Sequence, residues 1–125
     1  MTAALCEAAA DTVSSEIGKA AGRRAHLITN FHSVPAGTDG GITFQGTLAG
    51  IIAAWIVAAV ASSFNVITGF WLLPAMLSGI AGMLLDSVLG AKLQRPGLLG
   101  NDSVNFISTA FAAGLTLGYG LLLMS

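Results

Sequence analysis

Charged residues are scarce in this sequence. Aspartate, glutamate, lysine and arginine make up 9% of its 125 residues, whereas a soluble domain carries about 25%. Hydrophobic residues reach 54%, and the mean hydropathy is +0.81. This composition excludes an ordinary soluble domain and predicts an integral membrane protein. The formal net charge of −1 offers no electrostatic basis for binding nucleic acid, so we expect no nucleic-acid partner.

Cysteine and histidine are also rare. Cys6 is the single cysteine, which excludes an internal disulfide framework. His26 and His32 lack the spacing to a cysteine or to a second ligand that is typical of metal sites. We interpret both histidines as residues of an interfacial loop.

Long stretches of the chain contain no charge at all. No charged residue lies between Asp39 and Asp86, and none follows Asp102. A transmembrane helix needs about 20 apolar residues, so residues 40–85 hold two spans and residues 103–125 hold a third. We predict spans near residues 44–63, 66–93 and 103–124. Pro74 indicates a kink or a late helix start in the second span.

The alanine-rich N-terminus predicts a fourth helix, near residues 1–18, that ends at Gly18. Glu7 and Asp11 lie one turn apart and begin a polar stripe. Charge is costly inside a bilayer, so this stripe is expected to face protein or water. The predicted fold class is therefore all-α. A single membrane domain, residues 1–125, forms a bundle of about four helices with a glycine-rich loop after the first.

The distribution of lysine and arginine predicts the orientation. With these spans, all the basic residues fall on one side of the membrane: Lys19, Arg23, Arg24, Lys92 and Arg95. The turn at residues 62–65 and the C-terminus, on the other side, contain none. By the positive-inside rule, both basic loops are predicted to be cytoplasmic.

The stretch from Val34 to Gly50 carries a cluster of glycines around one carboxylate. Gly37, Gly40 and Gly41 permit backbone conformations and close approaches that a side chain would forbid. Consecutive N–H groups in such a turn can form an anion-binding concavity beside Asp39. The alternative is an ordinary glycine-rich loop between two helices.

Most of the acidic residues are expected near the same cytoplasmic face: Asp11, Glu16, Asp39, Asp86 and Asp102. Asp86 lies on an i,i+4 stripe of small and polar residues, which is expected to face other helices. Several carboxylates together with cations at one face suit a polyanionic substrate with Mg²⁺, since magnesium is typically held by one or two carboxylates and substrate phosphates.

Three of these acids also have a structural interpretation. Asp86 could pair with Lys92 or be hydrated at the interface. Asp102 could be a helix N-cap, and Glu16 could be only the i,i+3 partner of Lys19. Asn105 and Thr109 have no capping role, so their polarity requires partners within the bundle.

Several motifs, in order over about residues 8–110, resemble an integral-membrane family that includes transmembrane protein nineteen and plant phytyl-phosphate kinase. The matching residues are Ala10-Asp11-Thr12, Ser15-Glu16-Ile17-Gly18, Leu27-Ile28-Thr29, Val34-Pro35 with Gly37-Thr38-Asp39-Gly40-Gly41-Ile42-Thr43 and Gly46-Thr47, Asp86-Ser87 with Gly90-Ala91 and Gln94, and Asn101-Asp102 with Val104-Asn105-Phe106.

The resemblance implies an enzyme that transfers a phosphoryl group from CTP or another nucleotide to an isoprenoid monophosphate. Under this hypothesis Asp39 and Asp86 are the catalytic residues. The remaining site residues fall into two groups: a nucleotide- and phosphate-binding group of Gly37, Thr38, Gly40, Gly41, Lys19 and Asn105, and a Mg²⁺-binding group of Asp11, Asp86 and Asp102.

Family members are longer and carry an upstream Arg…Gln-Val-Leu-Ala-Asn-Gly motif. The resemblance therefore implies that this chain corresponds to a C-terminal half. We expect it to be inactive alone and to need the missing N-terminal half or a second copy. The pairs Gly46/Gly50 and Gly114/Gly118 would be packing surfaces. The alternative function is a non-catalytic membrane subunit or transporter fragment, whose buried acids serve helix pairing or ion coupling.

Overall fold

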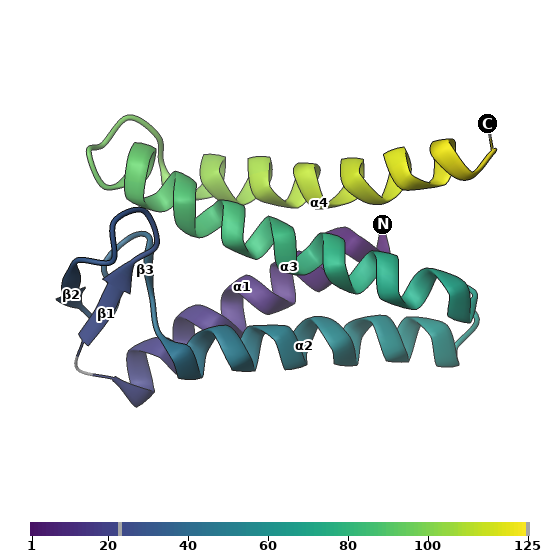
Figure 1. Ribbon diagram of the computed structural model, residues 1–125, viewed down its shortest axis with the longest axis horizontal. Coiled ribbons are helices and arrows are strands. Elements are labelled where there is room, and N and C mark those ends of the chain that lie inside the picture. Colours follow the sequence, from purple (N-terminus) through teal and green to yellow (C-terminus); the bar gives the residue numbers. More distant parts are fainter. Residues whose placement is uncertain (23, 125) are drawn as a thin grey trace.

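A computed structural model describes residues 1–22 and 24–124; Arg23, one of the predicted cytoplasmic basic residues, lies outside them. Four helices dominate: α1 (Thr2–Ala21), α2 (Phe44–Ser63), α3 (Leu72–Leu89) and α4 (Asn101–Met124). They run alternately in opposite directions along one bundle (Figure 1). The predicted all-α bundle of about four helices is therefore confirmed.

Three of the helical segments, Phe44–Ser63, Gly69–Gln94 and Asn101–Met124, are long and apolar enough to cross a membrane. Large apolar side chains cover their outer surfaces, for example Trp55 and Ile56 on α2 and Leu121 and Leu122 on α4. Exposing such apolar surfaces to water would be unfavourable, whereas in a bilayer they contact lipid. The exposed apolar surface confirms the prediction of a membrane protein.

Helix α1 packs against the other three helices. Its contact with α2 depends on glycine: a Cβ on Gly46 would lie 2.4 Å from the Ser14 carbonyl oxygen, and one on Gly50 would lie 2.8 Å from that of Ala10. The Gly46/Gly50 pair is therefore a packing surface within this chain. Gly114 and Gly118 have no heavy atom within 4 Å of such a Cβ, so among the described residues they form no packing contact.

Two predicted boundaries were wrong. Helix α1 continues through Gly18 to Ala21 and ends at Gly22. Gly18 serves packing instead, because a Cβ there would lie 3.0 Å from Thr43 Oγ1. Helix α3 begins at Leu72, after a short 3₁₀ turn at Gly69–Trp71. Pro74 therefore marks a late helix start, since proline fits the first turn of a helix.

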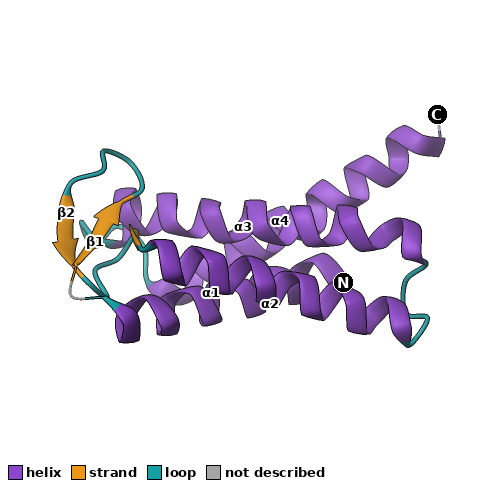
Figure 2. Cartoon of the chain, turned by 60° about the horizontal axis from the view of Figure 1, so that its bottom comes forward, coloured by secondary structure: helices purple, strands orange, loops and turns teal. Residues whose placement is uncertain are grey.

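The polar segment between α1 and α2 forms a small antiparallel sheet, which the sequence analysis did not predict. Strand β1 (Arg24–Leu27) lies between β2 (Ser33–Pro35) and β3 (Gly41–Ile42). Ala25 pairs with Val34, and His26 pairs with both Ser33 and Ile42. The sheet covers the end of the bundle where α1 and α3 finish and α2 and α4 begin (Figures 1 and 2). It holds the glycine-rich loop against the helix ends.

Helix α3 ends in a π-helical turn at Gly90–Gln94, which leads into the loop before α4. Lys92 belongs to this turn, Arg95 follows it, Lys19 ends α1 and Arg24 begins β1. The described basic residues thus share the end of the bundle that carries the sheet, whereas the α2–α3 turn lies at the opposite end (Figure 2).

Candidate functional site

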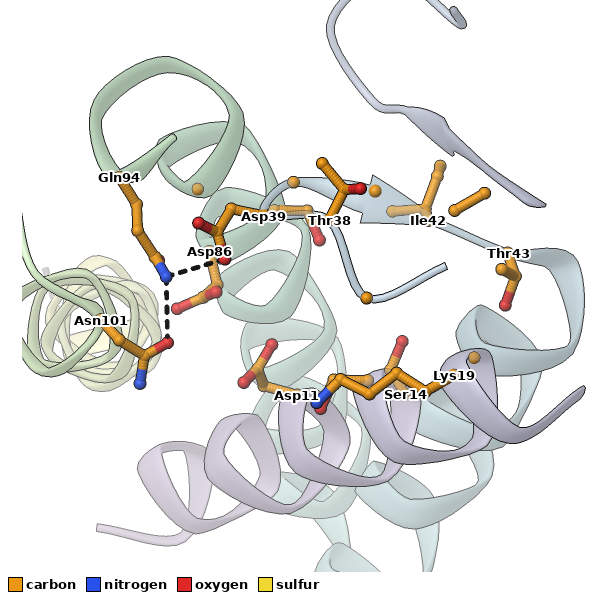
Figure 3. Close-up of a pocket in the computed structure, with 18 residues that line it drawn as sticks. Asp11, Ser14, Lys19, Thr38, Asp39, Ile42, Thr43, Asp86, Gln94 and Asn101 are labelled. Carbon is orange, nitrogen blue, oxygen red and sulfur yellow. Dashed lines mark hydrogen bonds between the residues drawn. The ribbon is translucent and has the colours of Figure 1, made fainter. Parts of the chain in front are cut away.

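A polar cavity of about 160 Å³ lies between the sheet and the helix ends. Figure 3 shows the cavity with its lining residues drawn as sticks. Four segments that are distant in the sequence supply most of its lining: the C-terminal half of α1, the segment from Gly37 to Thr43, the end of α3 with its π-turn, and the first residue of α4. Ala25 of β1 also lines it. The lining residues include Asp11, Ser14, Ser15, Gly18, Lys19, Gly37, Thr38, Asp39, Gly40, Gly41, Thr43, Asp86, Ser87, Gly90, Gln94 and Asn101.

The cavity brings together most of the predicted site residues. Asp11, Asp39 and Asp86 all line it, and the carboxylates of Asp11 and Asp86 approach it from α1 and α3 (Figure 3). Lys19 and the loop residues Gly37, Thr38, Gly40 and Gly41 also line it. Two predicted residues, Asp102 and Asn105, do not, and we leave them out of the proposed site.

The start of α4 explains why Asp102 lies outside. The helix begins at Asn101, so Asp102 falls in its first turn and is exposed. There its charge complements the positive end of the helix dipole. The neighbouring Asn101 side chain faces the cavity instead. Asn105, one turn further on, contributes its carbonyl oxygen to a hydrogen bond from Ser108.

A polar contact fixes Asp39 relative to α3. The Gln94 side-chain amide donates to Asp39 Oδ1 at 2.9 Å and approaches Asn101 Oδ1 at 3.4 Å (Figure 3). Gln94 therefore connects the glycine loop with the end of α3 and the start of α4. Gln94 belongs to the family pattern but had no predicted role.

The glycines of the loop serve turn formation and close packing. Gly37 and Gly40 have φ values of 88° and 73°, which disfavour any residue with a Cβ. A Cβ on Gly40 would lie 2.3 Å from the backbone nitrogen of Ala91. The N–H groups of Thr38 and Gly41 already donate to Pro35 O and Thr38 O within the loop. Two of the donors in the predicted anion-binding turn are thus engaged.

Helix ends supply a second source of positive potential. Thr43 caps α2 by accepting a hydrogen bond from the Gly46 N–H at 3.0 Å, and Thr43 and Asn101 both line the cavity. The N-termini of α2 and α4 therefore reach the same space, and helix N-termini favour anions.

The side-chain charges around the cavity are mostly negative. Against three carboxylates stands Lys19, whose amine forms an ion pair with Glu16 at 2.9 Å. This bond confirms the structural interpretation of Glu16 as the i,i+3 partner of Lys19. Among the described residues no ion pair joins Asp86 to Lys92. A cavity with this charge balance suits a cation, or an anion that brings a cation with it.

Asp86 is held from below by a buried polar cluster. The Ser108 hydroxyl lies 3.0 Å from Asp86 Oδ2 and 2.8 Å from Glu7 Oε1, and Thr109 donates to the other oxygen of Glu7. Glu7 is 1% exposed and Ser108 is fully buried. Glu7 and Ser108 were not predicted as site residues, whereas Thr109 was expected to need a partner within the bundle. The signal for Glu7 was its position one turn before Asp11.

The cavity is lined by oxygen-bearing side chains, the kind of ligand that magnesium binds. Within residues 1–22 and 24–124, no three His, Cys, Asp or Glu side chains are close enough to form a complete metal site. Magnesium does not require one, because it keeps several waters and binds through one or two carboxylates plus substrate phosphates. Asp11 and Asp86 could supply the carboxylates, with the hydroxyls of Ser14 and Ser87 beside them.

The fold and the site together define a class: a polytopic helical membrane protein with an acidic cavity at one end of the bundle. Within that class, the chain belongs to a known family. Residues 1–113 match the model of the integral membrane protein family DUF92. This match confirms the family resemblance drawn from the sequence motifs.

Curated relatives agree with this assignment. The chain is 39% identical to an uncharacterized membrane protein of Methanocaldococcus jannaschii over 84% of this chain and 44% of that protein. It is 39% identical to the chloroplastic protein VTE6 of Arabidopsis thaliana over 86% of this chain and 33% of that protein. It is 31% identical to protein PGR of the same plant over 85% of this chain and 49% of that protein.

The chain thus spans between a third and a half of the length of these relatives. No solved structure matches it.

Proposed function

We propose that this chain provides the site of a membrane-embedded isoprenoid-phosphate kinase, which transfers a phosphoryl group from CTP or another nucleotide to a polyprenyl monophosphate. The observation that carries the proposal is the convergence of Asp11, Asp39 and Asp86 on one cavity at the end of an apolar bundle. The motif resemblance to a family that includes plant phytyl-phosphate kinase, together with the match to the family model, supports the choice of reaction.

The charge balance explains how such a site would hold phosphates. Three carboxylates would repel a bare nucleotide, so the nucleotide would enter with Mg²⁺. Asp11 and Asp86 would hold the ion, which neutralises phosphate charge when bound. The N-termini of α2 and α4 and the amine of Lys19 would orient the phosphate oxygens. Asp39, held by its hydrogen bond from Gln94, would keep the glycine loop over the nucleotide.

The reaction then needs positioning more than base catalysis. An oxygen of the lipid monophosphate attacks the terminal phosphorus of the nucleotide, the bond from that phosphorus to the bridging oxygen breaks, and the nucleoside diphosphate leaves. An ionised phosphate acceptor is already a nucleophile, since its second pKa is near 6. A lipid alcohol would need a general base to accept its proton, and Asp39 or Asp86 would serve as that base.

The surroundings of the cavity suit a substrate with a polar head and an apolar tail. The head would lie among the polar residues at the sheet end of the bundle. The tail would lie along the exposed apolar surfaces of the spans, which carry residues such as Leu84 and Phe106. We place the sheet end, with its basic residues, on the cytoplasmic side.

We also propose that the chain works together with a further segment or a second copy. It spans less than half of its curated relatives, and α4 is the least buried of the three spans. Gly114 and Gly118 on α4 would let another helix approach closely.

The test measures CTP-dependent formation of isoprenoid diphosphate by the chain in nanodiscs, together with the remaining part of the protein when one exists. Asp39→Asn and Asp86→Asn should each abolish transfer, because they remove charge and keep shape. Asp102→Asn is the matched control, since Asp102 is exposed and outside the cavity. Unchanged transfer in both cavity variants would show that the reaction takes place elsewhere, and the absence of Mg²⁺-dependent CTP binding by the chain itself would favour the alternative of a non-catalytic subunit or transporter fragment.

A further inference from the structure

Three helices meet at a single hydroxyl beneath the cavity. Ser108 Oγ of α4 lies 2.8 Å from Glu7 Oε1 of α1 and 3.0 Å from Asp86 Oδ2 of α3. It also lies 3.0 Å from the carbonyl oxygen of Asn105 in its own helix. Both Glu7 and Ser108 are inaccessible to solvent, with 1% and 0% exposure. Water therefore does not replace these contacts, and each polar atom depends on its protein partner.

Close helix packing holds this junction in place. A Cβ on Gly82 of α3 would lie 2.5 Å from Glu7 Cγ and 2.9 Å from the Ser108 carbonyl oxygen. The glycine thus lets α1 and α4 approach α3 one turn before Asp86. The second oxygen of Glu7 is occupied by the hydroxyl of Thr109. Glu7 does not line the cavity itself, and Ser108 connects it with Asp86 through hydrogen bonds.

A serine hydroxyl has one hydrogen, and three acceptors surround it. Glu7 and Asp86 therefore compete for the same donor. Removing one carboxylate changes the hydrogen bond that the other receives. This coupling is a property of the geometry and does not depend on any bound ligand.

We propose that Glu7 and Ser108 are positioning residues for Asp86, which orient its carboxylate toward the cavity. This inference rests on the proposed function for its catalytic meaning, because Asp86 is the carboxylate assigned there to the cation. Groups behind a metal ligand fix the orientation of that ligand, and their loss typically weakens metal binding by about 10- to 100-fold. Glu7 itself does not touch the substrate.

The first test measures the coupling directly by infrared spectroscopy. Glu7 and Glu16 are the only glutamates in the sequence, so in a Glu16→Gln background, carboxyl-¹³C glutamate labels Glu7 alone. Ser108→Ala and Asp86→Asn should both shift the carboxyl band of Glu7. Thr116→Ala is the control, since this α4 hydroxyl is directed at Ala112 O and lies outside the junction. An unmoved Glu7 band in Asp86→Asn would refute the inference.

The second test measures binding of Mn²⁺, as a probe for the magnesium site, in the presence of CTP by electron paramagnetic resonance on the full chain in nanodiscs. Ser108→Ala should weaken binding about 10-fold or more, and Ser108→Cys, which conserves volume, should do the same if the hydroxyl is the cause. Glu7→Gln retains an acceptor for Ser108 and should lose less affinity than Glu7→Met. Thr116→Ala should bind like the wild type.

The two tests separate the possible failures. Wild-type affinity in both Ser108 variants would refute the positioning role. If the wild type itself bound no Mn²⁺ in the presence of CTP, the proposed function would fail in its metal requirement. In that case the infrared band alone would decide whether Glu7 is coupled to Asp86.

Discussion

The contact between Gly40 and the π-turn allows a sharp prediction about what holds the glycine loop over the cavity. Gly40→Ala introduces two separate costs. The first is the left-handed backbone at φ 73°, which costs a residue with a Cβ about 1–2 kcal/mol. The second is a collision, because the new Cβ would lie 2.3 Å from Ala91 N and 2.5 Å from Ala91 Cα. Both neighbours are backbone atoms, which cannot rotate away.

Two other glycines isolate these costs. Gly97 has a φ of 82° and nothing within 4 Å of its Cβ position, so Gly97→Ala carries the conformational cost alone. Gly90 has an ordinary helical φ of −55°, and its Cβ would lie 2.9 Å from Gly40 N, so Gly90→Ala carries a collision from the other side of the same contact. Overpacking of this kind costs about 1–3 kcal/mol, offset in Gly90→Ala by up to about 1 kcal/mol of helix propensity.

We expect Gly97→Ala to lower the free energy of unfolding by about 1–2 kcal/mol and Gly40→Ala by about 2–5 kcal/mol. The assay is equilibrium unfolding of the chain in detergent micelles, followed by tryptophan fluorescence. Limited proteolysis between residues 36 and 42 provides a local measurement, since a displaced loop should be cut faster in Gly40→Ala and Gly90→Ala but not in Gly97→Ala. Equal effects of Gly40→Ala and Gly97→Ala would show that the loop is not packed against the π-turn.

Further predictions concern other contacts. Gly50→Ala should destabilise the chain by about 1–3 kcal/mol, because its Cβ would lie 2.6 Å from Met83 Sδ and 2.8 Å from Ala10 O; Gly114→Ala, with nothing within 4 Å, should stabilise it by up to about 1 kcal/mol. Thermal unfolding in detergent compares the two, and a neutral Gly50→Ala would contradict the α1–α2 packing. Lys19→Ala should change stability by less than about 1 kcal/mol, since its pair with Glu16 is largely exposed; a larger loss on denaturant unfolding would indicate a contact beyond that pair. Gln94→Leu should accelerate proteolysis of the glycine loop with little change in helix content, because it removes the 2.9 Å bond to Asp39; an unchanged cleavage rate would show that the bond does not hold the loop. For orientation, Ser63→Cys should react with an impermeant thiol reagent from outside the cell and Arg95→Cys only after permeabilisation, and the reverse pattern would invert the predicted topology.

The sequence by itself determined the membrane class and the spans. The uncharged runs are long enough that only helices can satisfy their backbone polar groups in a bilayer, so the bounds of α2 were predicted to the residue and those of α4 to within two. Asp11 and Asp86 were recognised as candidate site residues because ionisable groups in such helices require a protein or water-filled environment. The glycine loop was recognised because residues without a Cβ mark close approach or positive φ.

Local sequence rules were insufficient where a residue's role depended on a distant partner. Gly18 reads as a helix stop, but Thr43 packs on it and the helix continues. The small sheet was missed because its strands have two to four residues, too few to show alternation. Asp102 and Asn105 were expected in the site from the predicted topology and the family pattern, whereas Asn101 is the residue of α4 that lines the cavity.

Only the tertiary structure decided which polar residues meet. Glu7 and Ser108 are 101 residues apart, and the hydrogen bond between them exists because Gly82 lets α1 and α4 close on α3. Gln94 and Asp39 are separated by 55 residues and meet because the glycine loop packs on the π-turn. Composition and periodicity specify the face of a helix on which a side chain lies, but contact between two faces depends on the packing of the whole bundle.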